Sequence, residues 1–197
     1  MTDNAWIVGV VTGLISGLIS GYLVWLITTR LPNKKRRTMI RKSLATRYAL
    51  FRREVCQILL QAEDEDSDKF EVGPSAKELS HHEAFYSYYT VENTRHWYAA
   101  INGLHANRQY VRKLSDCMMA FRAELLMVMA NVEIDDDKLF EHLTWFVVRL
   151  REECDRMESG CDMENVLMFL LRFMGRWSNM KGKVDDDYVE DLINSIK

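Results

Sequence analysis

Between residues 91 and 113 the chain gathers the side chains that bind small anionic ligands. Four basic residues face a single carboxylate in this stretch, and histidine, asparagine and aromatic residues lie among them. The residues concerned are Arg95, His96, Trp97, Tyr98, Asn102, His105, Asn107, Arg108, Tyr110, Arg112 and Lys113. Guanidinium groups pair with phosphates, amides read base edges and aromatic rings stack on bases. The stretch therefore predicts a binding site for a small nucleotide.

Further residues of the same kind precede this stretch. Arg52 lies upstream, and His81 and His82 come just before a tyrosine-rich segment. The complete predicted ligand-binding set is Arg52, His81, His82, Arg95, His96, His105, Asn107, Arg108 and Arg112. A structural role is the alternative for each residue, because Arg and His also pair with acidic groups and aromatic residues also fill cores.

Catalytic motifs are absent from the sequence. It contains no P-loop, no glycine-rich dinucleotide fingerprint, no nucleophile elbow and no HExxH motif. His81, His82 and Glu83 do not form a metal motif, because adjacent side chains on a helix point about 100° apart. The sequence therefore predicts no catalytic residue, no metal and no cofactor, and we do not expect an enzyme.

The four cysteines also lack the spacing of a metal site. Cys56, Cys117, Cys154 and Cys161 form no CxxC pair and no zinc-type pattern with histidine. We expect them to be reduced thiols, mostly buried.

The charge of the chain is uneven along its length. The formal net charge is −3, but residues 48–197 hold 18 basic and 28 acidic residues, a net charge of −10. A domain this acidic is not expected to bind duplex nucleic acid, which requires a basic surface. An anionic ligand would have to meet a local basic patch.

The elements that must position these residues are predicted to be helices. Apolar residues recur at helical spacing after residue 38, and no useful strand-like alternation occurs. The predicted helices cover residues 38–62, 76–89, 93–132 with a break near Gly103, 137–157, 163–177 as an apolar core helix, and a short helix after Asp185 to Asp187. The sequence therefore predicts an all-α domain.

The N-terminal run from Ala5 to Ile27 contains 23 residues without a charge. At about 1.5 Å per residue it reaches about 34 Å, enough for one transmembrane helix. Small residues repeat along one face, and such faces pack helices closely in membranes. The predicted packing residues are Gly9, Gly13, Ser16, Gly17, Ser20 and Gly21.

Basic residues that follow this run predict its orientation. Eight Lys and Arg residues lie between Arg30 and Arg47, whereas the residues before the run carry only Asp3. This asymmetry places the C-terminal side in the cytoplasm and the N-terminus outside. A cleaved signal peptide would need a positive start and a shorter apolar core. We therefore expect a membrane segment with a basic junction at residues 1–37 and a cytosolic domain at residues 38–197.

This layout resembles a known family. One glycine-rich span, a basic junction and a small helical domain containing Asn102 to Arg108 resemble the membrane effectors of bacterial type III CRISPR defence. The resemblance is to members with a helical sensor, since the Rossmann-like sensor common in that class is not indicated here. It implies a homo-oligomer, expected to be a tetramer, that binds a cyclic oligoadenylate such as cyclic tetra-adenylate. Binding would lead to disruption of the bacterial inner membrane.

Three other functions fit parts of the sequence. The chain fits a membrane-tethered adaptor whose acidic helical domain recruits a protein partner. A holin-like component would make the membrane leak without any ligand. An enzyme would turn over a nucleotide in the presence of a metal.

The glycine repeat yields a first prediction. Replacing both Gly13 and Gly17 by Leu should abolish membrane activity, because bulky side chains prevent close helix packing in lipid. Ligand binding by the helical domain should be unchanged. Toxicity in cells that survives the double replacement would exclude close packing of the span as the mechanism.

Overall fold

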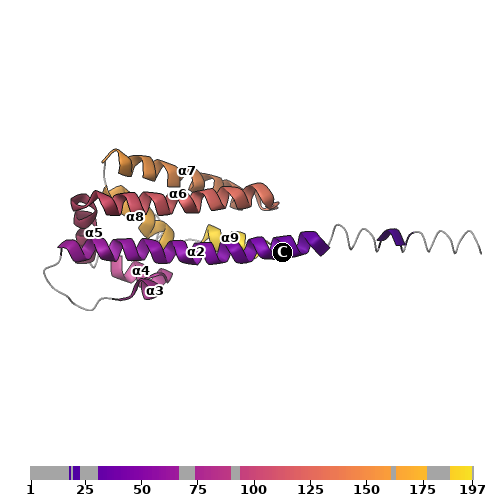
Figure 1. Ribbon diagram of the computed structural model, residues 1–197, viewed down its shortest axis with the longest axis horizontal. Coiled ribbons are helices and arrows are strands. Elements are labelled where there is room, and N and C mark those ends of the chain that lie inside the picture. The colour runs from indigo at the N-terminus through magenta and orange to yellow at the C-terminus, as the bar shows by residue number, and fades with distance from the viewer. Residues whose placement is uncertain are drawn as a thin grey trace, which may run out of the picture. The chain divides into compact units, whose positions relative to one another are not determined.

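A computed structural model describes the fold (Figure 1). The described residues are 18, 20–22, 31–66, 74–89, 94–160, 163–176 and 187–196. Within these ranges the secondary structure is helical, with short turns and loops and no strand. The prediction of an all-α domain is confirmed for this part of the chain. The helices are α2 (Leu31–Asp66), α3 (Ala76–Leu79), α4 (His82–Tyr89), α5 (Thr94–Ala106), α6 (Arg108–Asn131), α7 (Asp137–Glu158), α8 (Met163–Gly175) and α9 (Tyr188–Ser195).

The chain divides into two units, residues 1–40 with residue 197, and residues 41–196. The helical domain and all the sites below belong to the second unit. No helix among the described residues combines the length and the apolar character needed to cross a bilayer.

The predicted span lies almost entirely outside the described residues. Of its packing residues, Gly9, Gly13, Ser16 and Gly17 fall outside them. Ser20 and Gly21 are described, and both are helical and exposed. The span and its packing face therefore remain predictions from the sequence.

One side of α2 supplies a large part of the core. The residues buried along it are Leu44, Tyr48, Phe51, Val55, Cys56, Ile58, Leu59 and Ala62. Their spacing of three and four residues places them on one helix face, as the sequence predicted. Phe51 stacks on Phe121 of α6, with ring centroids 4.3 Å apart. Phe146 of α7 packs on Phe173 of α8 at 4.2 Å, so aromatic contacts run through the centre of the domain.

Helices α6 and α7 lie side by side and antiparallel (Figure 1). Arg122 Nε donates to the carbonyl oxygen of Val147 at 3.1 Å. The Cys154 thiol lies 3.7 Å from the carbonyl oxygen of Ser115. The earlier residue of α6 thus contacts the later residue of α7, so the two helices are antiparallel.

Helix α8 is the central helix, as its apolar sequence predicted. It contacts α4, α5 and α7. Its buried residues are Met163, Val166, Leu167, Phe169, Leu170, Leu171, Met174 and Gly175. The helix ends at Gly175 rather than at the predicted Trp177, and Trp177 lies outside the described residues.

Several helices begin at an N-cap residue whose side chain is a carboxylate or a serine hydroxyl. Asp136 accepts from the backbone N–H groups of Lys138 and Leu139 at the start of α7. Ser75 and Glu78 form a capping box at the start of α3. Such side chains satisfy N–H groups that the first helical turn leaves without partners. The predicted acidic start of the 137–157 helix is confirmed.

The predicted divisions between helices are wrong at two places. The predicted helix at residues 76–89 is wrong, because the chain turns at Ser80 and His81 and divides it into α3 and α4. The predicted break near Gly103 is also wrong, since Gly103 lies inside α5. The break occurs at Asn107, whose side chain accepts from the Gln109 N–H at 2.9 Å and caps α6.

Gly103 instead allows α5 to approach α2 closely. A Cβ atom at this position would lie 1.8 Å from the carbonyl oxygen of Ala62. Such a distance is far inside van der Waals contact, so any side chain at residue 103 would push the two helices apart. Helix packing, rather than chain reversal, explains this glycine.

Gly103→Ala should therefore destabilise the domain by about 1–3 kcal/mol or more, the range of overpacked cores. Gly175→Ala is the matched control, because its Cβ would lie 3.3 Å from the Tyr86 Cβ and needs a smaller adjustment. Urea unfolding followed by circular dichroism measures both. Equal stabilities of the two variants would contradict the proposed close contact.

Candidate functional site

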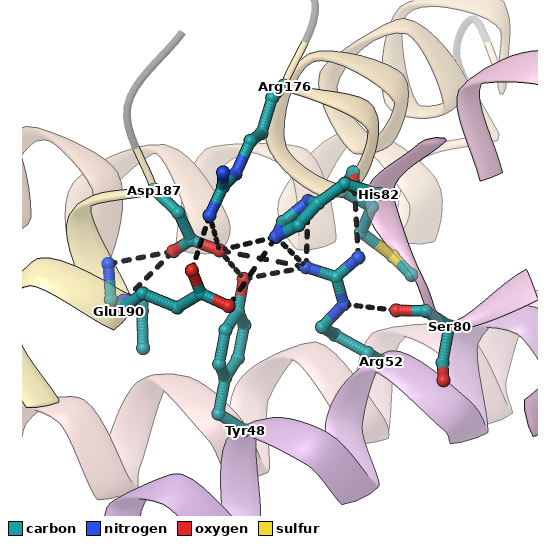
Figure 2. A network of polar contacts seen from close by, with 9 residues as sticks. Tyr48, Arg52, Ser80, His82, Arg176, Asp187 and Glu190 are labelled. Carbon is teal, nitrogen blue, oxygen red and sulfur yellow. Dashed lines mark hydrogen bonds and ion pairs between the residues drawn. The ribbon is translucent and has the colours of Figure 1, made fainter. Parts of the chain in front are cut away.

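Arg52 lies at the centre of a buried polar cluster (Figure 2). Its Nε donates to the carbonyl oxygen of Ser80 at 2.7 Å, and Nη2 donates to that of Met174 at 3.1 Å. Nη1 lies 3.2 Å from the Tyr48 hydroxyl. The guanidinium therefore links α2 to the turn before α4 and to the end of α8.

Asp187 is the acidic partner in this cluster. Its Oδ1 accepts from the N–H groups of Val189 and Glu190, both at 3.0 Å, and so caps α9. Its Oδ2 accepts from the Tyr48 hydroxyl and lies 3.6 Å from Arg52 Nη1. One carboxylate therefore both begins α9 and attaches it to α2. We refer to Tyr48, Arg52, His82, Arg176, Asp187 and Glu190 as the Arg52 cluster.

His82 closes the cluster from α4. Its Nδ1 lies 2.6 Å from the Met174 carbonyl oxygen, and its Nε2 lies 3.0 Å from Asp187 Oδ2. Arg52 Nη1 lies 2.9 Å from Nδ1 and 2.6 Å from Nε2. A neutral imidazole donates from one nitrogen and accepts at the other. The ring therefore bridges the arginine and the acceptors around it.

The surroundings in the cluster shift the pKa values of Asp187 and Tyr48. Burial alone raises the pKa of Asp187, but hydrogen bonds from His82, Tyr48 and the Glu190 N–H outweigh it and hold the pKa below its ordinary value. Burial and the neighbouring Asp187 charge raise the pKa of Tyr48 well above its ordinary value. Asp187 is thus the charged member and Tyr48 the neutral donor.

The cluster also contains the ligand types of a metal site. Ligand atoms of His82, Asp187 and Glu190 lie within 4.8 Å of one another. However, Arg176 forms an ion pair with Glu190 and lies 3.8 Å from Asp187, and Arg52 lies beside the same carboxylate. Two guanidinium groups occupy the carboxylate oxygens and repel a cation. The geometry favours an internal salt-bridge cluster over a metal centre.

A cleft of about 410 Å³ opens beside this cluster. Arg52, His81 and His82 line it, together with Ser80 and Asn194. His81 is exposed, whereas Arg52 is only 5% exposed and is engaged by its own chain. Three of the predicted ligand residues therefore do meet, but two of them have internal partners.

A second cleft, of about 510 Å³, lies at the N-terminal end of α6. His105, Arg108 and Arg112 line it from α5 and α6, and we call it the arginine cleft. Its other lining residues are Leu104, Val111, Ser115, Asp116, Met157, Glu158, Gly160 and Met163. Across the described part of the chain, the side chains of His105, Arg108 and Arg112 have no hydrogen-bond or ion-pair partner. They remain available to a ligand.

The remaining predicted ligand residues lie elsewhere. His96 stacks on Tyr88 with ring centroids 4.0 Å apart, and its Nδ1 lies 3.0 Å from Glu63 Oε2. Burial raises the pKa of Glu63 above its ordinary value and outweighs the hydrogen bonds that lower it. Asn107 caps α6, and Arg95 is exposed on α5. The nine predicted residues therefore do not form one site.

Sequence reasoning missed the partners of the buried basic residues. From the sequence, Tyr48 belongs only to the predicted helix at residues 38–62, and Asp187 only to a predicted helix start. Glu63 lies just beyond the predicted helix at residues 38–62, whereas the structure includes it in α2, where it pairs with His96. The helix-start signal at Asp187 was correct, but nothing near it in sequence indicated its partner on α2.

The described thiols agree with the expectation for the cysteines. Cys56, Cys117 and Cys154 are free, and the first and last of them are buried. Cys161 lies outside the described residues. Burial raises the pKa of Cys56 to about 12, so this thiol is protonated at neutral pH.

Comparison with known proteins adds no assignment. No family model, no curated protein and no solved structure matches the chain.

The Arg52 cluster predicts a pH-dependent loss of stability. Asp187→Asn should cost about 3–5 kcal/mol at neutral pH, because it leaves Arg52 buried without its charged partner. A carboxyl with a lowered pKa stabilises the fold above its ordinary pKa of about 3.9, and this contribution is lost as the pH falls through the lower value in the folded state. The difference from the natural chain should therefore shrink in acid.

Asp136→Asn provides the control for this measurement. Asp136 caps α7 as Asp187 caps α9, but it is exposed and outside the cluster. Asn caps helices about as well as Asp, so each variant keeps its cap. Thermal unfolding from about pH 3 to about pH 7 compares the two. Equal melting temperatures for both variants at neutral pH would rule out a stabilising role for the buried charge.

Proposed function

We propose that the protein is a membrane-anchored antiviral effector whose helical domain binds a cyclic oligoadenylate. The arginine cleft is the proposed ligand site. The main support is that His105, Arg108 and Arg112 line one cleft and have no hydrogen-bond or ion-pair partners among the described residues. Arg52 and His82 in the buried cluster are, by contrast, engaged by their own chain.

The chemistry of the cleft fits a nucleotide. Guanidinium groups pair with phosphate oxygens through two parallel hydrogen bonds. Asp116 and Glu158 add carboxylates to the same lining, and carboxylates accept hydrogen bonds from ribose hydroxyls or amino groups. The apolar residues Leu104, Val111 and Met157 supply surface for a base.

The size of the cleft supports a shared ligand. Its volume of about 510 Å³ lies within the range of about 300–1,000 Å³ for sites that hold one drug-sized ligand. A ring of four nucleotides has more atoms than such a ligand. Each subunit would therefore hold one part of the ring, and equivalent subunits would surround it with cyclic symmetry. This arrangement favours a homo-oligomer, with a tetramer as the expected form.

The membrane action is the second part of the proposal. Its support is the uncharged run from Ala5 to Ile27, with its repeated glycines and basic junction. A ligand shifts an assembly only through different affinities for its states, so the ring must favour the active arrangement of subunits. The proposed outcome is disruption of the bacterial inner membrane.

Arg108→Ala and His105→Ala test the ligand site. Loss of a charged hydrogen bond costs about 1.5–3 kcal/mol, so each variant should weaken binding of cyclic tetra-adenylate about 10-fold to 100-fold. Oligomeric size without ligand should not change. Calorimetry on the full-length protein in detergent measures the affinity.

Arg95→Ala is the matched control, because Arg95 is an exposed arginine outside the cleft. It should bind like the natural chain. Unchanged affinity in both cleft variants would remove these residues from the site. Capture of a stoichiometric protein partner, with no nucleotide retained, would instead favour a membrane-tethered adaptor.

A further inference from the structure

Helix α6 carries two apolar stripes. The first faces the core through Val111, Leu114, Met118, Phe121, Leu125 and Val128. The second stripe consists of Met119, Ala123, Leu126 and Ala130, all exposed, and we call it the outer stripe. A surface helix needs one apolar stripe to face its own core, so the outer stripe requires another explanation.

Further large apolar side chains are exposed on α6 and on its neighbour α7. Met127 of α6 lies next to the outer stripe in sequence and is 50% exposed. Helix α7, the antiparallel neighbour of α6, exposes Phe140, Trp145 and Val148. Aromatic residues and methionine are enriched at protein interfaces, and large exposed apolar patches mark interaction sites.

The spacing of the outer stripe indicates a helical occupant. Its residues follow one another at intervals of four, three and four, which is the seam of a coiled coil. Large residues at 119 and 126 alternate with alanines at 123 and 130. In an antiparallel pair of such seams, each large residue faces a small one of the partner. A second copy of α6 therefore complements the first.

The charges at the two ends of the outer stripe fix this orientation. Arg108 and Arg112 precede it, and the exposed acidic segment from Glu133 to Asp137 follows it. A parallel pair would bring like charges together at both ends. An antiparallel pair places the acidic segment of each copy beside the arginines of the other, and symmetry repeats the contact. Asp116 and Glu158 line the same cleft as the arginines and oppose this attraction in part.

We infer that two copies of the chain pair antiparallel through the outer stripe of α6, each covering the arginine cleft of the other with its acidic segment. Residue 119 of one copy then lies opposite residue 130 of the second, and the acidic segment, which follows the end of α6 at Asn131, lies on the side of Arg112 of the other copy. The apolar stripe supplies the affinity and the charges supply the orientation. An anionic ligand for the cleft competes with the acidic segment, so the pair is a ligand-free form. The pairing goes beyond the proposed function and does not depend on it. Only the competition between the nucleotide and the acidic segment rests on the proposed function.

Cysteine cross-linking in membranes that contain the full-length chain tests the pairing. Cys117 is replaced by Ser throughout, because it is partly exposed. The double variant Met119→Cys with Ala130→Cys should give a covalent dimer under mild oxidation, and each single variant should give none. Within one helix these positions are about 16 Å apart, beyond the reach of about 7 Å for a disulfide.

Two glutamate variants in this double-cysteine background supply the matched controls. Leu126→Glu should abolish the cross-link, because it places a charge in the outer stripe. Leu50→Glu should leave it unchanged, since Leu50 lies on α2 and is 42% exposed, against 41% for Leu126. Absence of the covalent dimer in the double variant would overturn the inference, and so would an equal loss in both glutamate variants. Cross-linking of the single variants would contradict the antiparallel pair and indicate a parallel one.

Cyclic tetra-adenylate is then added before oxidation. The yield of the covalent dimer should fall at least several-fold, because ligand and acidic segment compete for the same arginines. An unchanged yield with bound nucleotide would overturn the competition. A cross-link that forms in a chain with no affinity for the nucleotide would leave the pairing intact and reject the proposed function.

Discussion

The ion pair between Arg52 and Asp187 is the contact on which the C-terminal part of the domain depends. Helix α9 has only eight residues, too few to be stable alone in water. Its first turn is capped by Asp187, and the same carboxylate attaches it to α2 and α4. A buried charge pair contributes little net stability but is costly to break. We therefore expect the cluster, together with the buried residues Val189 and Leu192, to select one position for α9 rather than simply to add stability.

The helices could be predicted because their signals are local. Apolar spacing located the buried face of α2, and carboxylates marked the starts of α7 and α9. Gly103 misled the prediction, since a glycine that permits close packing looks the same in sequence as one that ends a helix. Asn107 is of a residue type that often caps helices, but from the sequence it is predicted only to bind the ligand.

The candidate sites could be predicted only in part, because their partners are distant in sequence. The hydroxyl of Tyr48 meets a carboxylate 139 residues away. No spacing rule connects such positions, so the sequence predicts Arg52 and His82 as ligand-binding residues and leaves their structural role as an alternative without named partners. His105, Arg108 and Arg112 lie within eight residues of one another, and a single helix junction brings them together. Their convergence could therefore be anticipated.

The contact between Gly103 and Ala62 makes the position of His105 depend on α2. The two backbones meet here without an intervening side chain. A displacement of one helix is therefore not taken up by side-chain rearrangement at this point. His105 follows two residues later, in the last turn of the same helix. If the final turns of α2 tilt, we therefore expect the end of α5 to move with them, and His105 at the edge of the arginine cleft to move as well.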